Sequence, residues 1–296
     1  MLNPLETENI SAVGNLSKQK VFHANDHAVR QLGVLLTRRS KFIGGFSACC
    51  SCKISTFIKQ KHPTPSKFSI MCGRYSYAPT KKQVQEQLKG LDTPAQFRLR
   101  YNIAPTQQAL VILHEAPDQL TELTWGLVPR WSKDGANGGK LINARAETVA
   151  EKPSFQNAFR HRRCLVPADS FYEWRTEADR RKLPFRIRYK NGDLMFMAGI
   201  WEDWKQGDLH KRTFSIITSG ANTDMNDLHD RMPVLLTTEE QRQEWLFGTP
   251  GDALQQLAQV TPDGLLEKYR VSEKLNTPYN EGPELHEPVP SDGALF

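Results

Sequence analysis

The chain has 296 residues, of which 39% are hydrophobic and 24% are charged, with 19 glycines and 18 prolines. This composition excludes collagen-like, low-complexity and wholly disordered proteins, and it predicts one large or two small globular domains. No uncharged apolar stretch approaches the roughly 18–20 residues that a membrane helix needs. We therefore expect no membrane association.

The net charge of +6 is unevenly distributed along the chain. Residues 1–70 contain 10 Lys+Arg and 3 Asp+Glu, whereas residues 71–296 contain 29 and 30. The total charge is therefore no argument for nucleic-acid binding. Residues 140–190 are nevertheless locally basic, with 13 basic and 6 acidic side chains.

Residues 1–70 show no sustained apolar period, and we predict that they form an extension outside the domain. The apolar run from Phe42 to Cys49 is too short, too rich in glycine and too far from the start for an export signal. Cys49 and Cys52 have a C-x-x-C spacing without a second ligand pair, so we favour unpaired thiols over a zinc site. Five unevenly spaced cysteines suit a reducing compartment, and we expect a cytoplasmic protein without a bound metal.

The remaining sequence predicts short strands framed by helices. In chain order the expected elements are a helix capped by Thr80 and Gln83, strands at 108–113 and 120–125, a helix capped by Ser154, a hairpin of 184–189 and 193–198 around Asn191-Gly192, a strand at 213–218, a helix from the Thr237–Glu240 capping box to Gly248, and a helix from Asp252. Strands dominate the middle, and helices cluster at the ends. The predicted fold class is therefore α+β, a single domain at 71–276 built on mostly antiparallel, barrel-like β-sheet with flanking helices. Four prolines after Asn276 predict a loose tail at 277–296.

One segment superficially resembles a nucleotide-binding loop. In residues 134–141 the first glycine spacing of a P-loop is too short, and Leu141 replaces the hydroxyl that would hold magnesium. We interpret this segment as a flexible loop and expect no cofactor.

Six short strings carry the strongest functional signal. They are Met71–Tyr75, Arg100–Pro105, Trp125–Trp131, Leu141–Thr148, Phe171–Trp174 and His229–Pro233. In this order and spacing they resemble the SOS response-associated peptidase (SRAP) family, whose members shield abasic sites by crosslinking to single-stranded DNA. The resemblance extends from about Met71 to about Asn276.

The resemblance implies a set of site residues. The catalytic residue would be Cys72, exposed as the N-terminus when Met71 is removed, and its partners would be Asn143, Glu173 and His229. Arg74, Arg145 and Arg231 would contact DNA or its phosphates, and Pro105 and Trp131 would lie beside the bases that flank the lesion. Ser132 follows Trp131 where some relatives carry a second tryptophan.

The residue types suit this chemistry. An opened abasic sugar presents an aldehyde, and only an N-terminal cysteine offers an amine and a thiol on adjacent carbons, which together close a thiazolidine. With a pKa near 7.8, about one α-amine in seven is neutral at pH 7, against about one lysine in two thousand five hundred. Glu173 can transfer protons during imine formation, and His229 can assist sugar opening as acid or base.

Two other functions fit the same residues. Cys72 and His229 could form a thiol peptidase, which could cut the chain before Cys72. The basic region could instead belong to a non-covalent single-strand-binding protein. Each of these residues also has a structural interpretation when it is considered alone. Cys72 could be a small buried side chain, Glu173 a solvated charge, and His229 a surface residue paired with Asp230. We favour the crosslinking function, with a monomer that associates with the nucleoid when it is bound to DNA.

The exposure of Cys72 has two possible origins. Translation could start at Met71, or a longer precursor could be cut before Cys72. The missing periodicity and the distinct charge of residues 1–70 favour the first.

Overall fold

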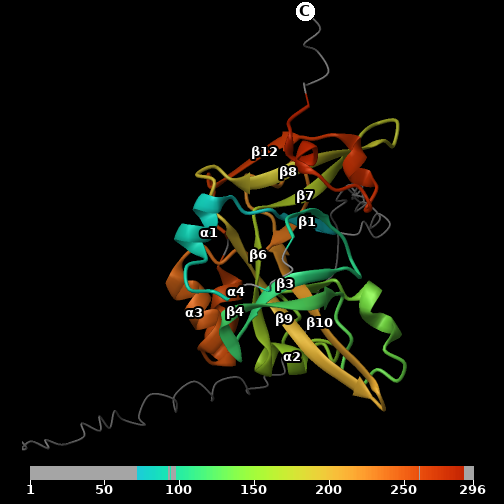
Figure 1. The fold of residues 1–296 in the computed structure, drawn as a ribbon, viewed down its shortest axis with the longest axis vertical. Coiled ribbons are helices and arrows are strands. Elements are labelled where there is room, and N and C mark those ends of the chain that lie inside the picture. The colour runs from blue at the N-terminus through green and yellow to red at the C-terminus, as the bar shows by residue number, and fades with distance from the viewer. Residues whose placement is uncertain (1–71, 93, 95–97, 260, 290–296) are drawn as a thin grey trace, which may run out of the picture. The chain divides into compact units, whose positions relative to one another are not determined.

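The computed structural model describes residues 72–92, 94, 98–259 and 261–289, all of which belong to one compact unit (Figure 1). The extension at 1–70, with its Cys49–Cys52 motif, lies outside the described residues. Among the helices that are described, none is long and apolar enough to cross a membrane.

One of the two sheets is open and wholly antiparallel, with the strand order β12-β8-β7-β1-β2. Its strands are β1 (Arg74–Tyr77), β2 (Arg100–Ile103), β7 (Ser170–Thr176), β8 (Lys182–Tyr189) and β12 (Leu266–Arg270). Tyr75 pairs with Phe171, and Glu173 pairs with Phe185. Because side chains alternate across a strand, Phe171 and Glu173 lie on one face of β7, and Ser170 and Tyr172 lie on the other.

The second sheet closes on itself. Its main strands are β3 (Gln108–Leu113), β4 (Ala116–Trp125), β6 (Arg163–Ala168), β9 (Met195–Gln206) and β10 (Leu209–Gly220). The pairings β3–β4, β4–β10, β10–β9, β9–β6 and β6–β3 complete a ring. Two short strands, β5 (Asn143–Arg145) and β11 (Arg231–Pro233), extend the ring on either side of the end of β10. The fold is therefore the predicted α+β class, with a barrel-like, mostly antiparallel sheet.

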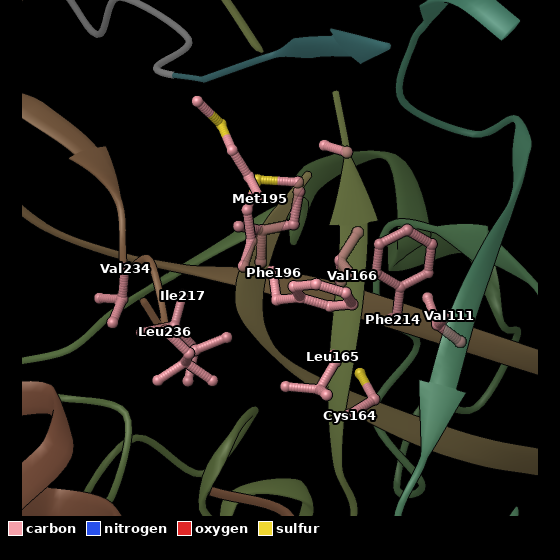
Figure 2. Close-up of a cluster of buried hydrophobic side chains, with 14 of the residues drawn as sticks. Val111, Cys164, Leu165, Val166, Met195, Phe196, Phe214, Ile217, Val234 and Leu236 are labelled. Atoms are coloured by element: carbon pink, nitrogen blue, oxygen red, sulfur yellow. The ribbon is translucent and has the colours of Figure 1, made fainter. Parts of the chain in front are cut away.

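The main hydrophobic core lies inside this ring and continues to the inner face of the open sheet. Figure 2 shows part of it, where Val166, Phe196 and Phe214 gather around β6. Val166 and Phe214 are fully buried. Burying one such side chain contributes about 1.5–3 kcal/mol, so this core stabilises the strands that carry the site residues.

The helices lie at the margins of the two sheets. They are α1 (Lys81–Gln87), α2 (Gln156–His161), α3 (Glu239–Phe247), α4 (Pro250–Ala258) and the 3-10 turns η1 (Ala136–Lys140), η2 (Glu273–Asn276) and η3 (Pro283–His286). Thr80 caps α1 in the predicted capping box with Gln83.

Three helices begin at residues other than those predicted. The capping box of α3 joins Thr238 and Gln241, one residue beyond the predicted pair. Helix α4 begins at Pro250, where Thr249 caps it and Asp252 closes the box from its third residue. Helix α2 begins at Gln156 without a side-chain cap, so the predicted cap at Ser154 was wrong.

The predicted hairpin at Asn191-Gly192 was also wrong. The chain does turn there, with Gly192 at a φ of 77° and its N–H bonded to the carbonyl of Tyr189. The strands on either side nevertheless enter different sheets, since β8 pairs with β7 and β12 while β9 pairs with β6 and β10. The side chain of Gln87 accepts a hydrogen bond from the Leu194 N–H and so holds the exit of the turn against α1. A β9–β10 hairpin forms instead at Gly207, whose φ is 55°.

Residues 271–289 pack on the outer face of the open sheet, although the sequence predicted a loose tail from 277. Leu285 of η3 is 1% exposed and packs in a second apolar cluster with Tyr172, Val271 and Leu275. Val271 also forms a bridge with Pro288. The spaced apolar residues of this segment allow it to cover a sheet face despite its prolines.

The loop that resembles a P-loop contains the 3-10 turn η1. Gly135 precedes it with a φ of 63°, and a Cβ at this position would lie 2.9 Å from the Trp204 ring. A glycine is therefore needed here, because a side chain would collide with the indole ring that packs against the backbone.

Candidate active site

Cys72 and Glu173 meet where β1 and β7 run side by side. The register that pairs Arg74 with Tyr172 brings Cys72, just before β1, next to Glu173. The backbone N–H of Cys72 donates a hydrogen bond of 2.6 Å to Oε1 of Glu173. The two residues are 3% and 2% exposed, so a nitrogen, a thiol and a carboxylate share one dry site.

Burial changes the proton affinity of both side chains. It raises the pKa of the Glu173 carboxyl, an effect that the hydrogen bond from the Cys72 thiol and the charge of His229 partly offset. Burial also raises the pKa of the Cys72 thiol well above its ordinary value, and the neighbouring Glu173 charge adds to this. Glu173 therefore holds a proton more readily than a solvated glutamate, as a proton-transfer group requires.

His229 lies just before β11, with its side chain 13% exposed. Its Nδ1 accepts a 3.0 Å hydrogen bond from the N–H of Arg231 and lies 2.9 Å from a carboxylate oxygen of Asp230. A backbone N–H can only donate, so this hydrogen bond places the proton of the neutral ring on Nε2.

Arg231 and Arg145 flank the end of β10 from opposite sides. Thr218 of β10 pairs with Arg145 of β5 and with Pro233 of β11. The Arg231 guanidinium donates to the carbonyl of Thr218 at 2.6 Å, and both of its terminal nitrogens bind Glu147. The charge of Arg231 offsets part of the rise in the pKa of the Cys72 thiol, so this cation influences the buried cysteine.

The model of the family described as "SOS response associated peptidase (SRAP)" matches residues 71–278. The chain belongs to the SRAP family. The match begins at Met71, the residue before the buried cysteine.

Three relatives of this SRAP chain are each named an abasic site processing protein. YoqW of Bacillus subtilis is 42% identical over 224 residues, covering 73% of this chain and 99% of YoqW. YedK of Escherichia coli is 31% identical over 229 residues, covering 74% and 100%. HMCES of Rattus norvegicus is 28% identical over 248 residues, covering 70% of each.

A solved structure has the same fold as this SRAP chain. The crystal structure of a protein from Bacteroides thetaiotaomicron superimposes with a TM-score of 0.65 at 25% identity. It covers 74% of this chain and all of the other.

The remaining predicted residues of the SRAP site lie at different depths. Asn143 is half-buried in β5 beside Ile216 of β10, and Arg145 follows it on the exposed surface. Trp131 is 60% exposed, and its indole N–H donates to the carbonyl of Pro153. Pro105 is half-buried in the turn between β2 and β3.

Arg74 is engaged within the SRAP domain itself. Its guanidinium donates to Oδ1 of Asn102 at 2.7 Å and to the carbonyls of Leu275 and Asn276 at 2.8 and 3.3 Å. The structure thus brings Arg74 to the C-terminal segment, and its predicted contact with DNA stays a prediction.

Asn276 is a neighbour of the site that the sequence analysis did not identify. Its Oδ1 accepts a 2.6 Å hydrogen bond from the indole N–H of Trp174, and Arg74 stacks over the Trp174 ring at 5.9 Å. Trp174 directly follows Glu173, and Arg74 lies two residues after Cys72. The end of η2 therefore ties together the two strands that carry the reactive groups. Nothing in the local pattern around Asn276 indicates this role, because the contacts span about a hundred residues or more.

Among the described side chains, no group of three or more His, Cys, Asp or Glu residues lies where it could bind one metal ion.

Proposed function

We propose that this chain recognises abasic sites in single-stranded DNA and, once Cys72 is its first residue, forms a covalent thiazolidine link with the opened sugar. The names of its relatives support the lesion class. The observation that carries the chemistry is the 2.6 Å hydrogen bond between the Cys72 nitrogen and Glu173 in a buried site.

The reaction begins at the C1′ aldehyde of the sugar. The Cys72 amine adds to it, and Glu173 protonates the resulting hydroxyl so that water leaves and an imine forms. The thiol of Cys72 then adds across the C=N bond, with its proton passing to the nitrogen, and a five-membered ring closes. The raised pKa of Glu173 suits the delivery and return of this proton. His229, with its proton on Nε2, assists the opening of the sugar ring.

This reaction requires a free amine. While residue 71 is attached, the Cys72 nitrogen is an amide and cannot form an imine. Cys72 then has a φ of 42°, a left-handed conformation that costs an ordinary residue about 1–3 kcal/mol. Removal of residue 71 eliminates this strain, whether translation starts at Met71 or a longer precursor is cut.

Self-cleavage is one route to the amine. The Cys72 thiol would attack the carbonyl of residue 71, Glu173 would protonate the departing nitrogen, and water would hydrolyse the thioester. Peptidase action on other proteins has less support, because burial raises the pKa of the thiol and the thiolate is the nucleophile in such enzymes.

The test is a denaturing gel with an oligonucleotide that contains uracil and has been treated with uracil glycosylase. Protein that begins at Cys72 should give a shifted band that depends on the glycosylase. Cys72→Ala should abolish this band. Cys164→Ala, at a buried free cysteine of β6, should retain it. A band that survives Cys72→Ala, or no band with the wild type, would refute the proposal.

A further inference from the structure

The carboxylate of Glu147 binds Arg231, an arginine that the family resemblance predicts to contact DNA. Its two carboxylate oxygens accept hydrogen bonds from the two terminal nitrogens of Arg231, at 2.5 and 3.0 Å. This bidentate geometry is also the one by which arginine binds a phosphate. Both terminal nitrogens of the Arg231 guanidinium are therefore already bound by a carboxylate of the same chain.

The Glu147 carboxylate is also influenced by the charge of Arg145, a second arginine that is predicted to contact DNA. The hydrogen bonds and charge of Arg231, together with the charge of Arg145, hold the pKa of Glu147 below its usual range. The Glu147 carboxylate is therefore bound by Arg231 and close enough to Arg145 to be influenced by its charge.

The two partners differ in their freedom to move. The Arg231 side chain is 12% exposed and is also held by the Thr218 carbonyl, whereas the Glu147 side chain is 54% exposed in the turn after β5. An exposed glutamate can rotate into water at little cost. Exchange of the anion on Arg231 therefore requires movement of Glu147 alone.

We propose that Glu147 holds the place of a DNA phosphate and that binding of a single strand displaces it from Arg231. The inference rests on the proposed function. It makes Glu147 a residue that lowers the affinity for DNA in general, so that stable binding needs further contacts such as those made at the lesion. Removal of its charge should leave Arg231 available and strengthen binding.

The experiment measures binding of the full chain by fluorescence anisotropy. The probe is a labelled single strand with a tetrahydrofuran abasic analogue, which has no aldehyde and cannot crosslink. The variant is Glu147→Gln, which keeps the shape of the side chain. The matched control is Glu151→Gln, which removes the same charge from an exposed residue four positions along the chain. Thermal melts of each protein establish that the variants are folded, and Glu147→Ala provides a second variant.

We expect Glu147→Gln and Glu147→Ala to bind about 5–10-fold more tightly at low salt. The slope of log K against log salt should stay nearly unchanged, because the wild type makes the same phosphate contact once Glu147 is displaced; an added contact on a single strand would steepen it by about 0.7. Glu151→Gln should change affinity less than about twofold, as expected for a screened surface charge. Unchanged or weaker binding by folded Glu147 variants, with normal wild-type binding, would overturn this inference alone. A wild type that binds no single strand would contradict the proposed function and the inference together.

Discussion

Two buried carboxylates near β7 lie on opposite sides of the open sheet and have very different surroundings. Asp169 accepts hydrogen bonds from the Ala78 N–H, the Ser76 hydroxyl and the Arg186 guanidinium. Glu173 accepts a hydrogen bond from the nitrogen of Cys72, and burial raises its pKa. Asp169 is thus paired with a buried cation, whereas Glu173 lies beside the buried Cys72.

This difference separates a structural charge from a chemical one. A buried carboxylate that is bound by an arginine and several donors holds strands together. A buried carboxylate without a bound cation has a raised pKa and holds a proton more readily. In the proposed reaction the inner face of the sheet carries the chemistry, and the outer face holds β1, β7 and β8 in register.

The largest expected effect concerns the reactive carboxylate. Glu173→Gln should slow crosslink formation by about 10²–10⁴-fold, the usual range for a lost acid–base group. Binding to the tetrahydrofuran oligonucleotide should remain within about twofold of the wild type. Single-turnover gels and anisotropy measure the two quantities. Equal crosslinking rates for variant and wild type would remove Glu173 from the mechanism.

Asp169→Ala should instead destabilise the fold by about 3–5 kcal/mol, because it leaves the Arg186 charge buried without its partner. Chemical denaturation measures this loss. Asp208→Ala, in the exposed β9–β10 turn, is the control and should change stability by less than about 0.5 kcal/mol. A loss of less than 1 kcal/mol at Asp169 would contradict the distinction between the two faces.

Glu202 of β9 tests the same distinction at a third carboxylate. It is 2% exposed, its nearest cations are Arg162 at 3.4 Å and Arg130 at 4.0 Å, and burial raises its pKa to about 7. A pKa above the unfolded value means that stability is full below about pH 4.3 and is lost as pH rises to about 7. The raised pKa of Glu202 corresponds to a difference of roughly 3 kcal/mol in the free energy of unfolding between these pH values.

Glu202→Gln should therefore be more stable than the wild type at pH 8, by up to roughly 3 kcal/mol, and similar to it at pH 4. Denaturation curves at the two pH values measure the difference. Glu122→Gln, at an exposed position of β4, should show no such pH dependence. If Glu202→Gln is less stable than the wild type at pH 8, its arginines neutralise Glu202 as Arg186 neutralises Asp169.

The smallest effect is expected at the link between the two strands. Asn276→Leu removes the acceptor for Trp174 and should cost about 1 kcal/mol of stability. It should also slow crosslinking several-fold at saturating DNA, because Cys72 and Glu173 lose their alignment. Asn276→Asp keeps an acceptor oxygen and should restore the rate. If the aspartate variant is as slow as the leucine variant, Asn276 does not act through this hydrogen bond.

Local patterns in the sequence predicted elements whose signals lie close together in the chain. The capping box at Thr80 and the strand at 108–113 have their determinants within a few residues, and both were confirmed. The hairpin at Asn191-Gly192 failed because a turn signal does not specify which sheet the following strand joins. That choice depends on distant partners such as Gln87.

The candidate site shows the same limit. The six strings were sufficient to predict the family, and β1 and β7 do bring Cys72 to Glu173. The residues around Arg186 did not indicate that it is buried, because its partner Asp169 lies in the bend between β6 and β7. Glu147 and Asn276 were missed for a similar reason, since their roles arise from contacts with Arg231 and Trp174 across 84 and 102 residues.

The central claim, that the reactive group is the free amine and thiol of Cys72, can be tested directly by mass spectrometry. Protein that begins at Cys72 is compared with protein that retains Met71, each incubated with an abasic oligonucleotide and then digested. The account predicts that the peptide starting at Cys72 gains the mass of the abasic nucleotide fragment less one water, and that the protein retaining Met71 yields no such product. An equal yield of stable adduct from the protein that retains Met71 would contradict the thiazolidine and, with it, the proposed function.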